Sequence, residues 1–142
     1  MSITLKYSKF NADPSEAYPR RVSVSRPVIP IQLINGQERI SYLALIDSGA
    51  DSCILHASIG ETIGIAIESG KLEVLHGVTG KELKAYFHNI KIDVEGYEFD
   101  CYAGFSREIE HAPYGILGQT GFFDVFDIIF DYNKRRIELN MK

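Results

Sequence analysis

The sequence predicts a mostly β protein with one or two short helices. Four pairs of apolar segments are each joined by a short polar or glycine-bearing turn, which is the pattern of β-hairpins. Segments with helical spacing are few and brief. The 142 residues, with 45% apolar and 24% charged side chains, suffice for one domain with a packed core and are too few for two full lobes.

The first 27 residues predict a strand and loop arm that precedes the main domain, residues 28–142. Apolar and polar side chains alternate over residues 3–7, as in a half-buried strand. Residues 11–21 contain two X-Pro steps among polar side chains, which indicates a loop.

The main domain opens with the clearest hairpin signal in the chain. Asn35-Gly36 lies between two apolar segments, residues 28–34 and 40–46, and an Asn-Gly pair in this setting is typical of a tight hairpin turn. The second segment leads directly to Asp47.

The rest of the chain repeats the pattern of strand, turn and strand, with two short helical segments. The expected elements are a strand at 53–55, a helix at 57–63 ended by Gly64, strands at 72–75 and 83–87 around a tip at 76–81, strands at 89–94 and 97–103 around Glu95-Gly96, a polar loop at 107–113, an apolar segment at 114–118, a second helix at 121–126, and a hairpin of residues 127–131 and 136–139.

A faint internal duplication runs through these elements. The hairpin at Asn35-Gly36 leads to an apolar run and then to Asp47-Ser48-Gly49, and the hairpin at Glu95-Gly96 leads to an apolar run and then to Ile116-Leu117-Gly118. Two related halves of this kind predict a pseudo-two-fold domain.

Charge and composition exclude several classes of function. A net charge of -4 and a pI near 5.5 argue against a nucleic-acid partner, because phosphate contacts need clustered Lys and Arg. No run approaches the roughly 20 apolar residues that span a bilayer, and the N-terminus lacks a secretion signal. We therefore expect a cytoplasmic protein with no membrane partner.

The cysteines and histidines show no metal-binding pattern. Cys53 and Cys101 lie far apart in apolar segments, without a Cys-x-x-Cys pair, and are interpreted as reduced core thiols. The four histidines have no close ligand spacing. No metal and no cofactor are expected.

Asp47 is the candidate catalytic residue. It follows an apolar strand and precedes Ser48 and Gly49. A carboxylate at the end of a buried strand is costly unless it is hydrogen-bonded or functional. Asp, Ser and Gly also make ordinary β-turns, so the triplet by itself does not separate catalysis from a plain turn.

With its surroundings, the triplet resembles the retropepsin-like aspartic proteases, the single-lobed relatives of pepsin. The resemblance rests on Asp47-Ser48-Gly49-Ala50 after an apolar strand, a glycine-bearing hairpin tip at 77–80, Ile116-Leu117-Gly118 before a predicted helical turn, and the terminal hairpin. It covers about residues 28–140 and implies the closed β-barrel of the acid proteases.

The resemblance implies a role for each matched residue. Asp47 is the catalytic aspartate, the Ser48 hydroxyl bonds across paired active-site turns, and Gly49 leaves room for the substrate backbone. The implied substrate-binding set is Ala50, Asp51, the flap tip of Gly77, Val78, Thr79 and Gly80, and Ile116, Leu117 and Gly118 behind the active-site turn. Ser48 departs from the commoner Asp-Thr-Gly, keeping the hydroxyl but not the methyl group.

The implied chemistry needs two carboxylates, one as the base for a water molecule and a protonated one to polarise the scissile carbonyl. Only one such motif occurs here, so a homodimer is expected, with Asp47 and its mate on the two-fold axis. The resemblance also implies that the terminal strands, residues 3–7 and 136–139, contribute to the interface.

The expected function is that of an aspartic endopeptidase acting on a peptide or protein substrate. The alternative is a catalytically silent domain that keeps the fold for dimerisation or peptide binding, since one fold hosts many functions. A peptidase restricted to itself or to one dedicated partner is a third alternative.

Overall fold

Twelve β-strands make up most of the chain in the computed structural model, which describes all of residues 1–142. The strands are β1 (Ser2–Lys6), β2 (Ser8–Asn11), β3 (Ser23–Arg26), β4 (Val28–Asn35), β5 (Glu38–Ile46), β6 (Cys53–His56), β7 (Lys71–His76), β8 (Glu82–Val94), β9 (Tyr97–Ser106), β10 (Gly115–Leu117), β11 (Phe126–Asp131) and β12 (Arg136–Met141). Two short helical segments, α1 (Ala57–Thr62) and the 3-10 turn η1 (Ile67–Ser69), complete the fold. The mostly β class is confirmed. No helix is long and apolar enough to span a membrane.

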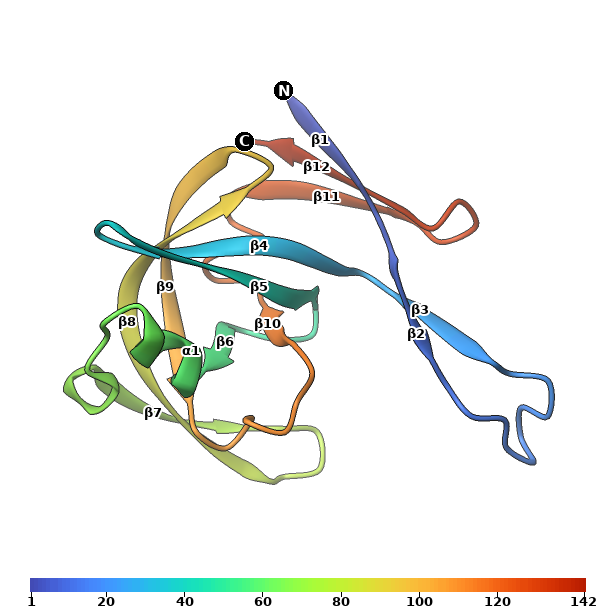
Figure 1. The fold of residues 1–142 in the computed structure, drawn as a ribbon, viewed down its shortest axis with the longest axis horizontal. Coiled ribbons are helices and arrows are strands. Elements are labelled where there is room, and N and C mark those ends of the chain that lie inside the picture. The colour runs from blue at the N-terminus through green and yellow to red at the C-terminus, as the bar shows by residue number, and fades with distance from the viewer.

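Six strands form a closed barrel (Figure 1). Their order is β4-β5-β10-β6-β9-β8, and β8 pairs back with β4 through residues such as Ile92, opposite Leu33. β7 pairs with the first part of β8, residues 82–87, and extends the sheet there. The predicted closed barrel is therefore confirmed.

The barrel has an internal pseudo-two-fold symmetry, as the duplication predicted. Exchanging β4, β5 and β6 with β8, β9 and β10 leaves every strand pairing unchanged, because β5 runs parallel to β10 as β9 runs parallel to β6. The two short strands meet at Ile54 and Ile116. The symmetry relates residues 59 positions apart. Asn35 corresponds to Val94 at the hairpin ends, and Leu45 corresponds to Gly104 further along.

The core fills the barrel and sets which side of each strand faces inward. Along β5, Tyr42, Ala44 and Ile46 are buried while Leu43 is exposed, which is the alternation of a strand with one covered face. Phe122 and Phe126 pack against Phe99, with ring centroids 5.1 to 6.0 Å apart within this group. Cys53 and Cys101 are free and buried, as predicted.

The prediction of a second helix at residues 121–126 is wrong. Gly121 has a φ of +103°, and its N–H donates to the Asp124 carboxylate at 3.1 Å, which makes a turn. Phe126 then begins β11. A positive φ at the first residue is incompatible with a helical start.

Two other boundaries also differ from the prediction. Residues 83–87 and 89–94 belong to one continuous strand, β8, because the polar His88 is accommodated in it by donating from Nε2 to the Ile67 carbonyl at 2.8 Å. The loop expected at residues 11–21 is bordered by β2 and β3, which pair with each other as a hairpin.

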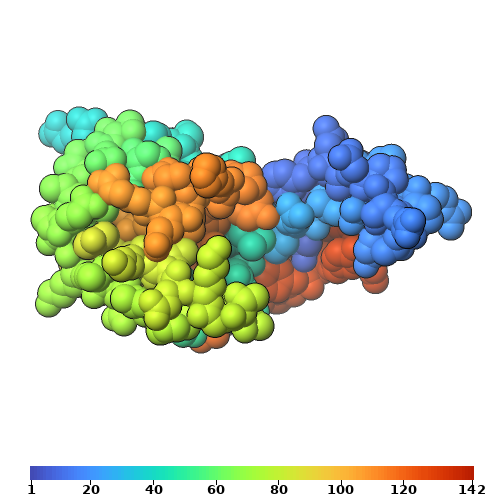
Figure 2. Space-filling model, turned by 90° about the horizontal axis from the view of Figure 1, so that it is seen from below, coloured from blue at the N-terminus to red at the C-terminus, as the bar shows by residue number.

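The chain termini form a separate three-stranded sheet in the order β1-β12-β11, across the top of Figure 1. The strands predicted at residues 3–7 and 136–139 are present, and they pair with each other within the chain. The β2–β3 hairpin, defined as residues 8–26, pairs with no other strand and stands out from the barrel in Figures 1 and 2.

Candidate active site

Asp47 begins a loop that leaves β5 at the rim of the barrel. Its N–H donates to the Leu117 carbonyl at 3.0 Å, and its Oδ1 accepts the Gly49 N–H at 2.9 Å. A Cβ at position 49 would lie 3.2 Å from Asp47 Oδ1, which is tighter than ordinary packing. Glycine at this position therefore leaves the carboxylate with backbone contacts only on that side.

Hydrogen bonds from the segment after β10 hold this loop in place. The Gln119 N–H donates to the Ala50 carbonyl at 2.8 Å, the Thr120 N–H donates to the Asp51 carbonyl at 2.9 Å, and the Gln119 side-chain amide donates to the Ser48 carbonyl at 2.8 Å. A Cβ on Gly118 would lie 2.3 Å from the Ser52 carbonyl oxygen, so only glycine fits there. The carboxylate is thus mounted on a loop whose backbone is held at several points.

The loop opens into a cleft of about 810 Å³. Three parts of the chain line it: the 47–52 segment with the barrel strands behind it, the β7–β8 hairpin, and the segment that follows β9. Of the residues predicted for the site, the cleft brings together Asp47, Gly49, Ala50, Asp51, Gly77, Val78 and Ile116.

The other predicted residues lie outside the lining. Leu117 is buried and Gly118 packs beneath the loop, so both support the site rather than face it. Ser48, Thr79 and Gly80 are exposed, and the Ser48 hydroxyl makes no hydrogen bond within the chain. The Asp51 carboxylate has no ion pair within the chain.

Sequence reasoning missed much of the lining. The additional residues are Ser52, Ile54, Leu75, His76, Lys81, Glu82, Leu83, Arg107, Glu108, Ile109 and His111. Gln119 and Thr120, which hold the loop, were missed as well, although they directly follow the Ile116-Leu117-Gly118 match and could have been included on that ground. No three His, Cys, Asp or Glu side chains cluster as a metal site would require.

The β7–β8 hairpin forms one wall of the cleft and ends in a tight apolar tip. The Gly77 N–H donates to the Lys81 carbonyl at 3.1 Å, and the Gly80 N–H donates to the Gly77 carbonyl at 2.9 Å. Gly80 has a φ of +78°, a conformation that favours glycine. Val78 is fully exposed at the tip.

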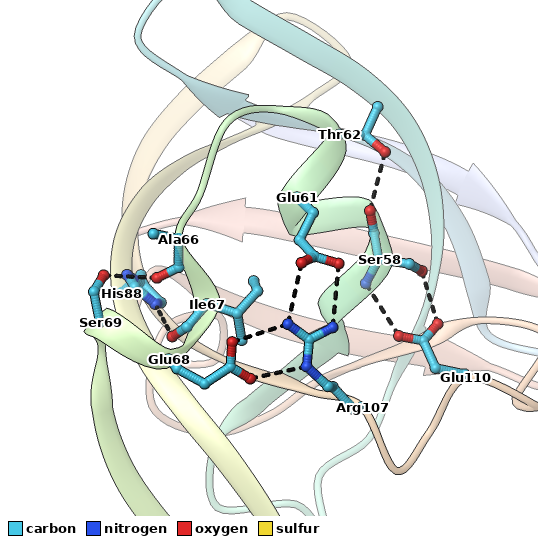
Figure 3. Close-up of polar contacts among 10 residues, drawn as sticks. All are labelled: Ser58, Glu61, Thr62, Ala66, Ile67, Glu68, Ser69, His88, Arg107 and Glu110. Carbon is cyan, nitrogen blue, oxygen red and sulfur yellow. Dashed lines mark hydrogen bonds and ion pairs between the residues drawn. The ribbon is translucent and has the colours of Figure 1, made fainter.

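Another part of the lining is a loop, residues 107–114, that is fixed by side chains (Figure 3) and adjoins the β7–β8 hairpin, since the Glu108 carboxylate accepts the Lys84 N–H. Arg107 forms ion pairs with Glu61 of α1 at 3.1 Å and with Glu68 of η1 at 2.8 Å. The Glu110 carboxylate accepts hydrogen bonds from the N–H and hydroxyl of Ser58 at 3.0 and 2.7 Å. One wall of the cleft is therefore anchored to neighbouring elements, whereas the tip of the other is not.

These contacts shift the ionisation of the anchoring groups. Burial acts to raise the pKa of Glu110, but the two hydrogen bonds from Ser58 outweigh it and hold the pKa below its ordinary value. Hydrogen bonds to Glu68 and Glu61 raise the pKa of Arg107. Because Arg107 is exposed, its pairs are worth little individually and act mainly to position the loop.

A buried Tyr42–His56 pair ties the same loop to the barrel. The Tyr42 hydroxyl donates to His56 Nδ1 at 2.5 Å and accepts the His56 N–H at 3.0 Å. His56 Nε2 donates to the Ala112 carbonyl at 2.8 Å, a pattern that assigns the ring proton to Nε2. Burial raises the pKa of the Tyr42 hydroxyl.

The internal symmetry of the barrel supplies only one acidic turn. A shift of 59 positions carries Asp47 onto Ser106, whose Oγ accepts the Glu108 N–H at 3.1 Å, as Asp47 Oδ1 accepts the Gly49 N–H. Ser106 is fully buried. The two turns share a backbone pattern, but one side chain is a carboxylate and the other a hydroxyl.

No family model and no curated protein match this chain. Among solved structures, a retropepsin-like aspartic protease from Rickettsia conorii matches with a TM-score of 0.56 and 14% identity, over 98% of this chain and 90% of that one. The EIAV protease in complex with the inhibitor HBY-793 matches with a TM-score of 0.49 and 18% identity, over 66% of this chain and 82% of that one. The fold of this chain is that of the retropepsin-like aspartic proteases, as the sequence resemblance implied.

Proposed function

We propose that this chain is an aspartic endopeptidase that acts as a homodimer and hydrolyses peptide bonds with water activated between two Asp47 carboxylates. The observation that carries the proposal is the mounting of Asp47: a carboxylate on a fastened loop, at the floor of a cleft with one anchored and one projecting wall. The retropepsin-like fold supports it.

In the proposed dimer the two Asp47 side chains hold one proton between them. The ionised carboxylate takes a proton from water as the water oxygen attacks the scissile carbonyl carbon, and the protonated one donates to the carbonyl oxygen. The carbon–nitrogen bond then breaks as the amide nitrogen takes a proton from one carboxyl group, and a hydroxyl of the tetrahedral intermediate returns its proton to the other, so that the pair again holds one proton. The single acidic turn in each barrel makes the second chain necessary.

The proposed roles of the neighbouring residues follow from where they lie. The Ser48 hydroxyl is exposed and has no hydrogen-bond partner within the chain, and its proposed role is to bond across to the partner's turn. The β7–β8 hairpin, with Val78 at its tip, acts as a flap that covers an extended peptide and excludes water. Ile54, Leu75 and Ile116 give the cleft apolar walls for substrate side chains.

Asp47→Asn tests the proposal most directly. We expect it to reduce cleavage of a peptide library by about a hundred- to ten-thousandfold, the usual contribution of acid–base catalysis, because the amide cannot accept the proton from water. Asp127→Asn, on β11 and outside the cleft lining, is the matched control and retains activity. An aspartic-protease inhibitor should block the wild type.

Two outcomes contradict the proposal. Undiminished cleavage by pure Asp47→Asn would place the chemistry elsewhere. A dimeric wild type that cleaves neither a broad library nor itself would favour the silent binding domain instead.

A further inference from the structure

The β2–β3 hairpin is folded without a core of its own. Its two strands pair only with each other, over four residue pairs, and none of residues 8–26 is buried. A two-stranded ribbon alone in water is at best marginally stable. We therefore expect the hairpin to be stabilised by packing against another surface.

One face of the hairpin is apolar. Phe10 lies opposite Val24, and the Ala12 N–H bonds to the Val22 carbonyl at 3.0 Å, which continues the same register. Side chains two positions apart share a face of a strand. Phe10, Ala12, Val22 and Val24 form the apolar outer part of one face, and Ser8 and Arg26 lie at its base, with the Arg26 guanidinium 5.6 Å from the Phe10 ring centre. The opposite face consists of Lys9, Asn11, Ser23 and Ser25.

The barrel covers only the root of this apolar face. The Phe10 ring lies 5.7 Å from the Tyr114 ring, and Ser8 Oγ donates to the Val28 carbonyl at 2.6 Å. Further out, Val22 is 72% exposed and Tyr18 is 62% exposed. Figure 2 shows the hairpin, in blue, as a lobe that projects beyond the body of the molecule.

The hairpin joins the barrel close to the candidate catalytic residue. Pro27, which directly follows β3, accepts a hydrogen bond from the Ile46 N–H at 2.9 Å, and Ile46 directly precedes Asp47. Tyr114, on which Phe10 packs, is the last residue of the anchored 107–114 loop. A second copy that brings its Asp47 to this one therefore meets the hairpin.

Charge favours the same occupant. The hairpin holds four of the 15 basic residues and two of the 19 acidic ones, so it is net positive. The rest of the chain, with 11 basic and 17 acidic residues, is net negative. The rest of a second copy thus carries a net charge opposite to that of the hairpin.

The terminal strands are less available for the same purpose. β12 is paired on both edges, with β1 on one side and β11 on the other, inside a single chain. Only the outer edges of β1 and β11 remain unpaired. The strands 3–7 and 136–139 thus satisfy each other without a partner.

We propose that the β2–β3 hairpin is a clasp for a second copy of this chain, its apolar face packing on the partner beside the partner's Asp47 loop. The inference rests on the homodimer of the proposed function and identifies the surface that forms it. A two-fold contact is isologous, so the hairpins of both chains take part. Each residue of the clasp therefore occurs twice in the interface.

The test compares the oligomeric state of the full chain and two matched variants by analytical ultracentrifugation. Val22→Asp places a charge on the clasp, and Ile129→Asp places one on β11 of the terminal sheet, at a side chain that is also exposed. We expect Val22→Asp to weaken the dimer by about a hundredfold, since two sites are changed at once, and Ile129→Asp to leave it unchanged. Unchanged far-UV circular dichroism shows that each variant is folded. Val22→Ser, which adds no charge, should shift the equilibrium in the same direction by less.

Each other result overturns the clasp. A Val22→Asp protein that dimerises like the wild type excludes the hairpin, and loss of the dimer in Ile129→Asp alone assigns the interface to the terminal sheet. A wild type that stays monomeric up to about 100 μM excludes both. Failure of the proposed function gives a different result. In that case Asp47→Asn leaves cleavage unaltered, while Val22→Asp still weakens the dimer.

Discussion

At the scale of single residues, glycines and one buried pair hold the candidate site in shape. Gly118 lies against the Ser52 carbonyl where no side chain fits, and Gly49 leaves the Asp47 carboxylate clear. Tyr42 and His56 connect β5 and β6 to the cleft wall through the Ala112 carbonyl. Because both side chains are buried, each hydrogen bond that is lost leaves a polar group without water.

Tyr42→Phe tests how much this pair contributes to the free energy of unfolding. The change removes the partner of both the His56 N–H and His56 Nδ1, so we expect a loss of about 1 to 3 kcal/mol in the free energy of unfolding. Urea unfolding measures it, with Tyr102→Phe as the control, because Tyr102 is exposed and its hydroxyl has no partner. Equal stability of the two variants would show that the pair is dispensable.

At the scale of elements, two parts of the cleft lining differ in how firmly they are held. The 107–114 loop is held by Arg107, Glu108 and Glu110, whereas the β7–β8 tip is held only by its own turn. Local stability follows the number of anchoring contacts. In the proposed enzyme, the tip is thus the part suited to move over a substrate, and the loop is the part suited to position it.

Acid should release part of the anchored wall. The pKa of Glu110 is lower in the folded chain than in an unfolded one, so its contribution is present above the ordinary Glu pKa of about 4.3 and is lost as pH falls through the lower, folded value. We expect protection of the Ser58 amide from hydrogen exchange to fall in that window by a few tenths of a kcal/mol, since Glu110 is largely exposed.

Glu110→Gln provides the comparison for this effect, measured by NMR across the same range. The variant should show weaker protection at neutral pH and no further loss on acidification. Glu73→Gln, on the exposed face of β7, should behave as the wild type. A Ser58 amide whose protection ignores pH in the wild type would rule out this role.

At the scale of the whole molecule, one barrel contains one acidic turn. The internal two-fold relates the Asp47 turn to a turn that begins with the buried Ser106, so each barrel holds only one carboxylate in such a turn. Proposed activity and proposed assembly are therefore one equilibrium, because a site shared by two chains exists only in the dimer.

Dilution tests that link. Activity per chain should fall as the concentration passes below the dimer dissociation constant, and an excess of Asp47→Asn chains should suppress the wild type by forming mixed dimers. Parallel sedimentation gives the dimer fraction, and the doubly changed Asp47→Asn, Val22→Asp chain is the control that should not suppress. Activity per chain that is independent of concentration would mean that one chain suffices.

Local signals in the sequence were enough for most of the strands and for the Asp47 loop. Gly36 and Gly96 supply the positive φ that the two hairpin turns need, and the strands beside them alternate or run apolar. One error occurred where a distant contact decides, because His88 stays within β8 by donating to the Ile67 carbonyl. The other is local: Gly121 adopts a positive φ and its N–H donates to the Asp124 carboxylate, which makes a turn at residues 121–126.

The sequence by itself determined the barrel strands, the acidic turn and the presence of only one such turn, because turn chemistry, strand periodicity and motif order are local properties. Only the tertiary structure decided that Gln119 and Thr120 hold the Asp47 loop, that residues 107–114 form an anchored wall, and that an apolar hairpin stands uncovered beside the site. These features depend on strand pairing between residues far apart in the chain, which no local pattern records.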